Sequence, residues 1–341
     1  MSTDTATAAA TPKADTVKMT GQQAVSAALF EAMEKDPKVL VFGEDVADRE
    51  GGGVMGTTRG LSTKFGDERV KSTPIAEQAI IGAAIGAALG GYKPVAEIML
   101  MNFTTVAMDM IVNHAAKLRF MSGGQSAVPI TIRTLTGAGF QTAGQHADHL
   151  EAWFCHTAGI KVVCPSNPAD YKGLLLSCID DPDPCIIIET GKTLFAPGEV
   201  PVDQGPIPLG KARIDREGTD VTLISYSSMV LTCQAAAVTL AEQGISAELI
   251  DLRTVSPWDK EAVLASARKT SRAVVVHEAV RSFGPGAEIA ATIQEELFGV
   301  LKAPVRRLGA PYSAVPFTKP LEDAYLVQPQ DVVAAVQSIM G

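Results

Sequence analysis

Hydrophobic and polar positions alternate between two patterns from residue 20 onward. Over residues 20–37 the apolar positions recur at helical spacing after Thr20, a typical N-cap residue. The run 38–46 is apolar on both faces, which predicts a buried strand. The same alternation predicts strands at 93–100, 128–135, 160–167 and 184–190, and helices at 103–121 and 167–180. Such strands, separated by helices, indicate a parallel sheet that is covered on both sides.

A second α/β region is predicted after a stretch rich in proline and glycine. Residues 196–212 contain four prolines and three glycines, which favours a linker at 196–208. Beyond it the pattern predicts strands at 220–227, 246–253, 272–279 and 303–310, and helices at 229–244, 258–270, 286–298 and 328–340. We therefore expect a first domain at 18–195 and a smaller α/β domain at 209–341.

Composition narrows the possible partners and the compartment. A net charge of −9 argues against nucleic acid or an anionic membrane surface. The longest apolar segment, 79–89, is too short and too rich in glycine to span a bilayer. Five cysteines form no Cys-x-x-Cys pair and lie in apolar runs, which indicates reduced thiols and a cytoplasmic location. Residues 1–17 lack both arginine and an apolar core, so we expect a disordered tail rather than a targeting peptide.

The predicted helix that begins near Glu77 has two unusual features. Glu77 is its single carboxylate. Burying an unpaired carboxylate costs free energy or raises its pKa, so such a residue normally has a charged partner or a functional role. Gly82, Gly86 and Gly90 repeat every four residues, which places a smooth stripe on one helix face. The stripe indicates either tight packing within the domain or contact with another subunit.

Three histidines gather in the segment 144–156. His146 and His149 would share a face if the segment were helical, and with Asp148 or Glu151 they would resemble a zinc site. His146 also follows a glycine-rich loop after a strand, where open α/β sheets place active sites. A functional and a structural imidazole remain equally open for His146, whereas His149 and His156 are typical of packing or capping residues.

An acidic turn is predicted at the end of the helix 167–180. Asp180, Asp181 and Asp183 lie close to the free carbonyls of the helix C-terminus. The turn is either a plain acidic turn or a cation site built partly from backbone oxygens.

Several ordered motifs resemble the β subunit of the thiamine-diphosphate-dependent component of 2-oxo acid dehydrogenase complexes. They include VFGEDVA, STPIAEQAIIGAAIGAA, VNHAAKLRFMSGGQ, GQHADHLEAWF, IDLRTVSPWD and VPFTKPLEDAYL, and the resemblance runs from residue 18 to the end. It implies a pyrimidine-binding domain with a parallel sheet, followed by a transketolase C-terminal-type domain.

The resemblance also implies roles for individual residues. Glu77 matches the family glutamate that holds the 1′ nitrogen of the cofactor's aminopyrimidine, and Gly82 and Gly86 would meet the partner subunit. His146 matches the active-site histidine, and Ile75, Met99 and Phe103 match positions of the cofactor pocket. The family's potassium site, formed partly by carbonyls, corresponds to Ile130, Cys178, Ile179, Asp181 and Asp183.

The family's diphosphate and magnesium motif, Gly-Asp-Gly followed later by Asn-Asn, is absent from the chain. In two-chain members it belongs to the α subunit, so the resemblance implies an α2β2 heterotetramer in which the α subunit holds magnesium. The implied reaction cleaves a 2-oxo acid such as pyruvate, or acetoin, and reductively acylates the lipoyl domain of an acyltransferase. The alternatives are a split transketolase-like carboligase and a non-catalytic scaffold subunit.

Two departures from the family pattern lie next to the expected site. The usual His-Ser-Gln reads His146-Ala147-Asp148, and the usual Ala-Asp-Phe or Ala-Asp-Tyr reads Met101-Asn102-Phe103. Because these neighbours face the substrate, they leave the substrate and the acyl acceptor open.

Overall fold

In the computed structural model, which describes residues 15–341, a seven-stranded sheet forms the centre of the first domain. Its order is β12-β6-β7-β5-β4-β2-β3. The six strands β2 to β7 run parallel, and only β12 is antiparallel. The bounds are β2 (Val39–Gly43), β3 (Val70–Ser72), β4 (Lys93–Leu100), β5 (Thr131–Thr136), β6 (Lys161–Val163), β7 (Cys185–Thr190) and β12 (Thr254–Ser256). The predicted parallel sheet is confirmed.

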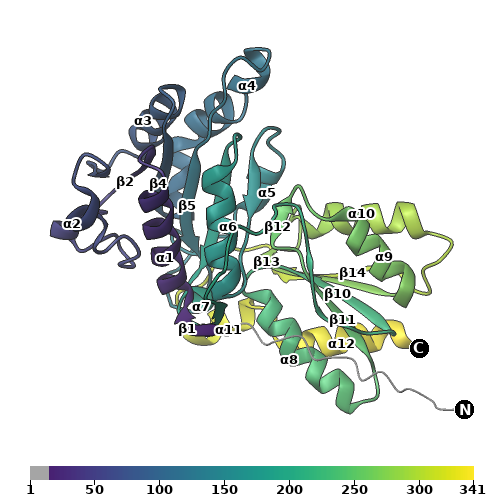
Figure 1. Cartoon of the computed structure of the whole chain (residues 1–341). Coiled ribbons are helices and arrows are strands. Elements are labelled where there is room, and N and C mark those ends of the chain that lie inside the picture. Colours follow the sequence, from purple (N-terminus) through teal and green to yellow (C-terminus); the bar gives the residue numbers. More distant parts are fainter. Residues whose placement is uncertain (1–14) are drawn as a thin grey trace, which may run out of the picture.

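Helices cover both faces of this sheet (Figure 1). Leu40 and Phe42 of β2 pack into one core, while Val39 and Val41 pack into the other, as strand alternation requires. The first core includes α3 (Glu77–Leu89), and the second includes α1 (Gly21–Lys35) and α6 (Pro168–Asp180). Thr20 caps α1 through a capping box, as predicted.

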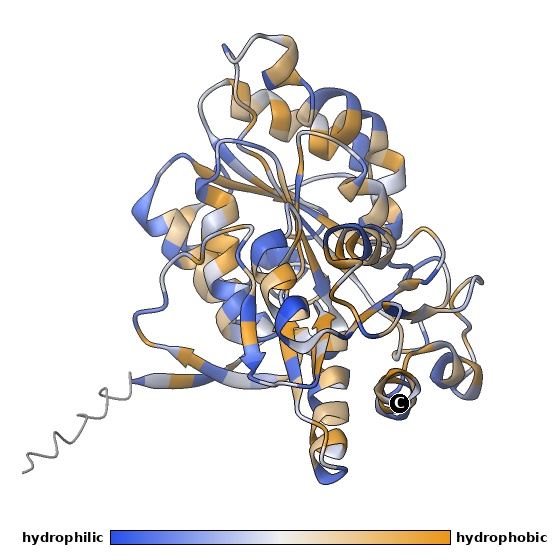
Figure 2. Cartoon of the chain, turned by 90° about the vertical axis from the view of Figure 1, so that its right-hand side faces the viewer, coloured by the Kyte–Doolittle hydropathy of each residue, from blue (hydrophilic) through white to orange (hydrophobic). Residues whose placement is uncertain are grey.

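A five-stranded sheet with the order β14-β13-β10-β11-β9 forms the second domain. Its strands are β9 (Arg213–Arg216), β10 (Val221–Ser225), β11 (Ala247–Asp251), β13 (Ala273–Val280) and β14 (Arg306–Ala310). Its helices are α8 (Met229–Glu242), α9 (Lys260–Thr270), α10 (Gly286–Leu297), α11 (Lys319–Tyr325) and α12 (Pro329–Met340). Figure 2 shows apolar residues concentrated on the central strands and polar residues on loops and outer helix turns.

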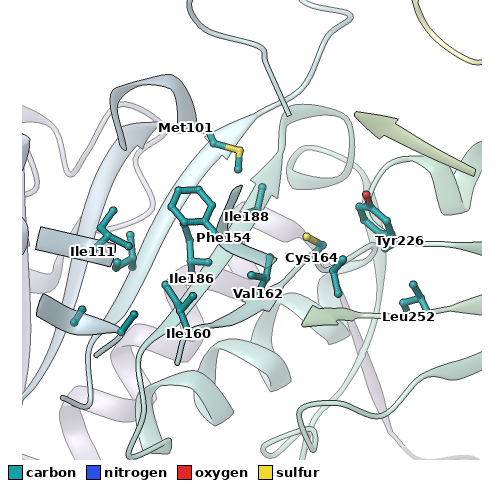
Figure 3. Packing of buried hydrophobic residues seen from close by; sticks show 14 of the residues in the cluster. Met101, Ile111, Phe154, Ile160, Val162, Cys164, Ile186, Ile188, Tyr226 and Leu252 are labelled. Carbon is teal, nitrogen blue, oxygen red and sulfur yellow. The ribbon is translucent and has the colours of Figure 1, made fainter. Parts of the chain in front are cut away.

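The two domains share one apolar core. Tyr226 and Leu252, from the second domain, belong to the same buried cluster as Val162, Cys164 and Ile186 of the first (Figure 3). In addition, β12 extends the first sheet although it follows β11 in the chain. The relative position of the domains is therefore fixed by packing and by strand pairing.

The structure corrects the predicted tail and linker. Strand β1 (Thr16–Thr20) pairs antiparallel with β8 (Pro197–Pro201), so Thr16 and Val17 belong to a strand and the expected linker contains one. The remainder of the predicted tail, residues 1–14, lies outside the described residues. Outside the segment 101–121, the remaining short helices are η1 (Asp48–Glu50), α2 (Leu61–Phe65), α5 (Glu151–Cys155) and α7 (Gly191–Leu194).

The continuous helix predicted at 103–121 is wrong. The segment contains a 3₁₀-helix η2 (Met101–Ala107), a π-helix η3 (Met110–Ala115) and a short α4 (Leu118–Met121). The hydroxyls of Thr104 and Thr105 donate to the carbonyls of Met101 and Asn102, three residues earlier. These local bonds, together with β-branching, favour the tighter turn over a regular α-helix.

No helix within residues 15–341 has both the length and the apolar character needed to cross a membrane.

Candidate active site

Glu77 is the first residue of α3 and is only 8% exposed. Its position at the helix N-terminus favours a negative charge, because the free amides of the first turn lie there. Among residues 15–341, no side chain forms an ion pair with it. The nearby charged group is Glu44, directly after β2 and also 8% exposed. Burial, and then the charge of Glu77, raise the pKa of Glu44. The charge of Glu77 thus acts on a second buried carboxylate, and no ion pair within residues 15–341 involves either group.

The glycine stripe of α3 lies on an uncovered face. No atom of residues 15–341 would come within 4 Å of a Cβ at Gly86, and at Gly82 the nearest atom is the sulfur of Met110, at 3.6 Å. An apolar hollow of about 560 Å³ opens over this face. Its lining consists of Ala76, Gln78, Ala79, Gly82, Ala83, Val106 and Met110. Packing within the domain therefore does not explain Gly86 and hardly explains Gly82, whereas Gly90, the third glycine, is the C-cap of α3.

Phe103 and His146 are brought together by η2 and by the loop after β5. Their rings lie 5.4 Å apart with an interplanar angle of 75°, an edge-on contact. Ile75, two residues before Glu77, is 84% exposed. Met99 lies elsewhere: it lines a separate small cavity with Met55, Glu97 and the buried Arg133. Its assignment to the cofactor pocket stays a prediction.

His146 lies in the loop 137–150, which connects the carboxyl end of β5 to α5. This segment is not helical, so His146 and His149 do not share a helix face: the His146 ring is exposed and the His149 side chain is buried. Within residues 15–341, no group of three or more histidine, cysteine, aspartate or glutamate side chains is arranged to hold a metal ion.

The two departures from the family pattern turn out to be partners. The amide of Asn102 donates to the Asp148 carboxylate at 2.9 Å and to the Gly144 carbonyl at 3.1 Å. The backbone amide of Asp148 donates to the Asn102 side-chain oxygen at 3.3 Å in return. This pair holds the His146 loop against η2, beside Phe103.

Carboxylates of the second domain hold the same loop from the opposite direction. The backbone amide of Ala138 donates to Glu278 Oε1 at 2.7 Å. The amides of Gly139 and Gln141 donate to Glu322 Oε1 at 2.7 and 3.1 Å. Glu278 lies near the end of β13, and Glu322 lies on α11, a helix that the sequence analysis did not predict. Their contact with the site is long-range and left no local signal.

The residues of the predicted potassium site converge where α6 ends and β7 begins. The carbonyls of Ile130 and Cys178 each accept one backbone hydrogen bond, from Cys185 and from Asp181. The acidic side chains are already paired with cations. Lys161 Nζ lies 2.5 Å from Asp181, and Arg119 lies 2.6 Å from Asp183. A metal ion here would therefore depend on carbonyl oxygens rather than on free carboxylates.

Comparison with known proteins identifies the family. Residues 17–195 match the transketolase pyrimidine-binding domain, and residues 210–332 match the transketolase C-terminal domain. The chain is 44% identical to acetoin:2,6-dichlorophenolindophenol oxidoreductase subunit beta of Bacillus subtilis, over 93% of this chain and 96% of the relative. It is 43% identical to pyruvate dehydrogenase E1 component subunit beta of the same organism, over 95% of this chain and 99% of the relative. The chain belongs to the family of these dehydrogenase β subunits.

The family assignment confirms the resemblance read from the motifs and the two-domain fold that it implied. Among solved structures, a split-gene transketolase described as an inactive beta4 tetramer superimposes on this β subunit with a TM-score of 0.78. It is 24% identical over 94% of this chain and 97% of that chain, so it supports the fold alone. A transketolase from Pichia stipitis gives a TM-score of 0.67 at 16% identity, covering 96% of this chain and 46% of that one.

Proposed function

We propose that this β subunit supplies half of a thiamine-diphosphate site that cleaves a 2-oxo acid or acetoin, and that an α subunit supplies the other half. One observation carries the proposal: the carboxylate of Glu77 is buried without an ion-pair partner among residues 15–341, and its neighbours Ala76 and Gln78 line an uncovered apolar face. A carboxylate in such a place is suited to exchanging a proton with a ring nitrogen.

The residues present fit one end of the cofactor. An acid at the head of α3, the exposed Ile75 and the ring of Phe103 together suit a flat, basic aminopyrimidine. When bound, thiamine diphosphate would supply the carbon nucleophile that the reaction at the substrate carbonyl needs. Glu77 holds and returns a proton at the pyrimidine 1′ nitrogen. His146, exposed beside Phe103, is placed to donate a hydrogen bond to a substrate oxygen and to assist acyl transfer.

Magnesium and the diphosphate belong to the α subunit in this proposal, because the Gly-Asp-Gly and Asn-Asn motif is absent from the chain. The uncovered glycine stripe supports a partner helix at α3, since small residues let two backbones approach closely. We propose an α2β2 heterotetramer that serves a lipoyl-bearing acyltransferase in the cytoplasm. All five cysteines are free thiols, as a reducing compartment requires.

Coexpression with a transketolase-type α subunit tests the function. The purified complex is assayed with thiamine diphosphate, magnesium and one substrate at a time: pyruvate, a branched-chain 2-oxo acid or acetoin. The electron acceptor is 2,6-dichlorophenolindophenol or a lipoyl domain. We expect turnover with one substrate class. Transfer of the substrate's carbon fragment to an aldehyde, without reduction of the dye, would instead establish the split transketolase-like carboligase. Full activity of complexes carrying both Glu77→Gln and His146→Ala would establish the scaffold alternative.

We also propose a potassium ion at the acidic turn formed by Ile130, Cys178, Ile179, Asp181 and Asp183, where backbone carbonyls rather than the paired carboxylates would hold it. The convergence of these groups supports it. Replacing sodium chloride by potassium chloride at constant ionic strength should raise the thermal midpoint of the β subunit, and an unchanged midpoint would contradict the site.

A further inference from the structure

His149 is a buried titratable group that the proposed chemistry does not use. Its side chain is 3% exposed and lies between two carboxylates from different domains. Nδ1 lies 3.4 Å from Glu151 Oε2, at the start of α5, and Nε2 lies 3.4 Å from Glu278 Oε1, at the end of β13. His149 Nε2 and Glu151 Oε2 have no hydrogen-bond partner of good geometry among residues 15–341, and at 3.4 Å each carboxylate is within ion-pair distance of the ring.

Each carboxylate that faces His149 has a second attachment. Glu151 Oε1 accepts a hydrogen bond from the Tyr226 hydroxyl at 2.7 Å, which links α5 to the second domain. Glu278 accepts from Ser228 and from the backbone amide of Ala138, at the beginning of the His146 loop. His149 thus closes a chain of contacts that runs from the loop to the second domain and back to α5.

The loop needs such an attachment because part of its backbone is strained. Gln141 and Ala143 have positive φ angles of 57° and 61°. Residues other than glycine adopt this backbone conformation at a cost of about 1–3 kcal/mol each. Gly137 and Gly139 have φ angles of 110° and 113°, a region open mainly to glycine. Strain of this kind persists only where surrounding contacts determine the conformation.

We propose that His149 is a positioning residue: as an imidazolium clamped between Glu151 and Glu278, it fixes the loop that places His146 against Phe103. Its two neighbours carry two negative charges, and His149 is the cation that pairs with both of them among residues 15–341. Loss of the imidazolium charge would leave two buried carboxylates in mutual repulsion across the domain boundary. The loop would then lose its attachment to the second domain at Ala138.

The surrounding groups agree with a permanently charged ring. Burial lowers the pKa of His149, but the charges of Glu278 and Glu151 outweigh it and raise the pKa to about 10. Burial raises the pKa values of the Glu151 and Glu278 carboxyls, but His149 lowers them. The net result is that both pKa values lie below their ordinary range. The other titratable groups around the cluster are Tyr226, Tyr325, Cys155, Cys164 and His277. Burial raises the pKa of each tyrosine and cysteine and lowers that of His277, so all five are neutral near pH 7.

Histidine NMR on the full-length β subunit tests the proposal. The chain has five histidines, and the edge-on Phe103 ring shifts the His146 signals by its ring current. We expect the His149 ring to remain protonated to about pH 9 or above in the wild type. In His149→Gln the His146 signals should move toward the values of a free imidazole. In Glu278→Gln, which keeps an oxygen to accept from Ala138, the titration of His149 should shift downward by at least one pH unit.

His156→Gln is the matched control, because this exposed histidine follows α5 and contacts neither carboxylate. It should leave the His146 signals unchanged. Unmoved His146 signals in a folded His149→Gln variant, or a His149 ring that titrates near pH 6.5 in the wild type, would overturn the proposal. If His149→Gln does not fold, Glu278→Gln decides: an unchanged His149 titration in that variant would overturn the proposal. The importance of His146 rests on the proposed function, but these signals report its position whether or not the complex is active.

Discussion

At the scale of single residues, the carboxylate of Glu77 makes the sharpest prediction. Glu77→Gln keeps the shape and a hydrogen-bonding group but cannot exchange a proton, so turnover of the complex should fall by roughly 10²–10⁴-fold. Because no ion pair within residues 15–341 depends on Glu77, the thermal midpoint and the assembly should be unchanged. Steady-state kinetics and calorimetry of the same preparation measure both. A matching loss of stability would assign Glu77 a structural role instead.

The Asn102–Asp148 pair gives a second prediction at this scale. The family pattern has a carboxylate at position 102 and an amide at 148, whereas this chain has exchanged the two groups across one contact. Asn102→Asp alone places two carboxylates in contact and removes the donor to Gly144, which should cost about 1–3 kcal/mol of unfolding free energy.

Adding Asp148→Asn to that variant restores an amide opposite a carboxylate and should recover part of the loss. Urea unfolding of the two single variants and the double variant measures the coupling. Additive effects would show that the two side chains do not interact in solution.

At the scale of elements, a substitution on the uncovered face of α3 should affect assembly with the α subunit without lowering the stability of the chain. A Leu side chain at Gly86 meets open space, and Leu is a good helix former, close to Ala, which favours a helix over Gly by roughly 0.8–1.0 kcal/mol. Gly86→Leu should therefore leave the isolated chain equally or more stable while it blocks the approach of the α subunit. Sedimentation of the variant mixed with the α subunit measures assembly. Ala235→Leu, on the exposed side of α8, is the control. A normal heterotetramer with Gly86→Leu would exclude this face as the interface.

The elements also show where sequence patterns succeed. Strand β4 has the predicted bounds, and α6 begins after Asn167 with Pro168 at its first position, since local periodicity and capping decide both. The prediction of a continuous helix at 103–121 was wrong because threonine hydroxyls compete locally with the α-helical pattern. Periodicity predicts that apolar residues face the core, but it does not distinguish 3₁₀ and π turns from an α-helix.

At the scale of the whole molecule, the candidate site depends on contacts that no local pattern contains. The sequence predicted Glu77, Phe103 and His146 through a family resemblance. It did not predict that Glu322 would hold the amide of Gly139, 183 residues earlier in the chain. Nor did it predict that β12 would join the first sheet, because the strand is three residues long and its partner is distant in sequence.

The contact between the domains makes overall stability depend on pH. His149 has a raised pKa in the folded chain, so its contribution is fully present below about pH 6.5 and is lost as the pH rises toward about 10. Over that window the unfolding free energy should fall by about 1.4 kcal/mol per pH unit from this group. Denaturant unfolding at several pH values measures the slope. His149→Gln should remove it, and an equal slope in that variant would assign the dependence to other groups.

The whole molecule finally determines what the chain can bind alone. In the proposed function the chain contributes Glu77 and an apolar face for an aminopyrimidine, but the sequence lacks the motif that holds a diphosphate and its magnesium. A dianionic diphosphate needs a metal ion and oriented backbone donors, which dominate the affinity of such a cofactor. Isothermal calorimetry of the isolated β subunit with thiamine diphosphate and magnesium should therefore show no appreciable binding. The α subunit should restore it, with the thermal midpoint rising only when cofactor, metal and both chains are present. Tight binding to the β subunit alone would contradict a site shared between two chains.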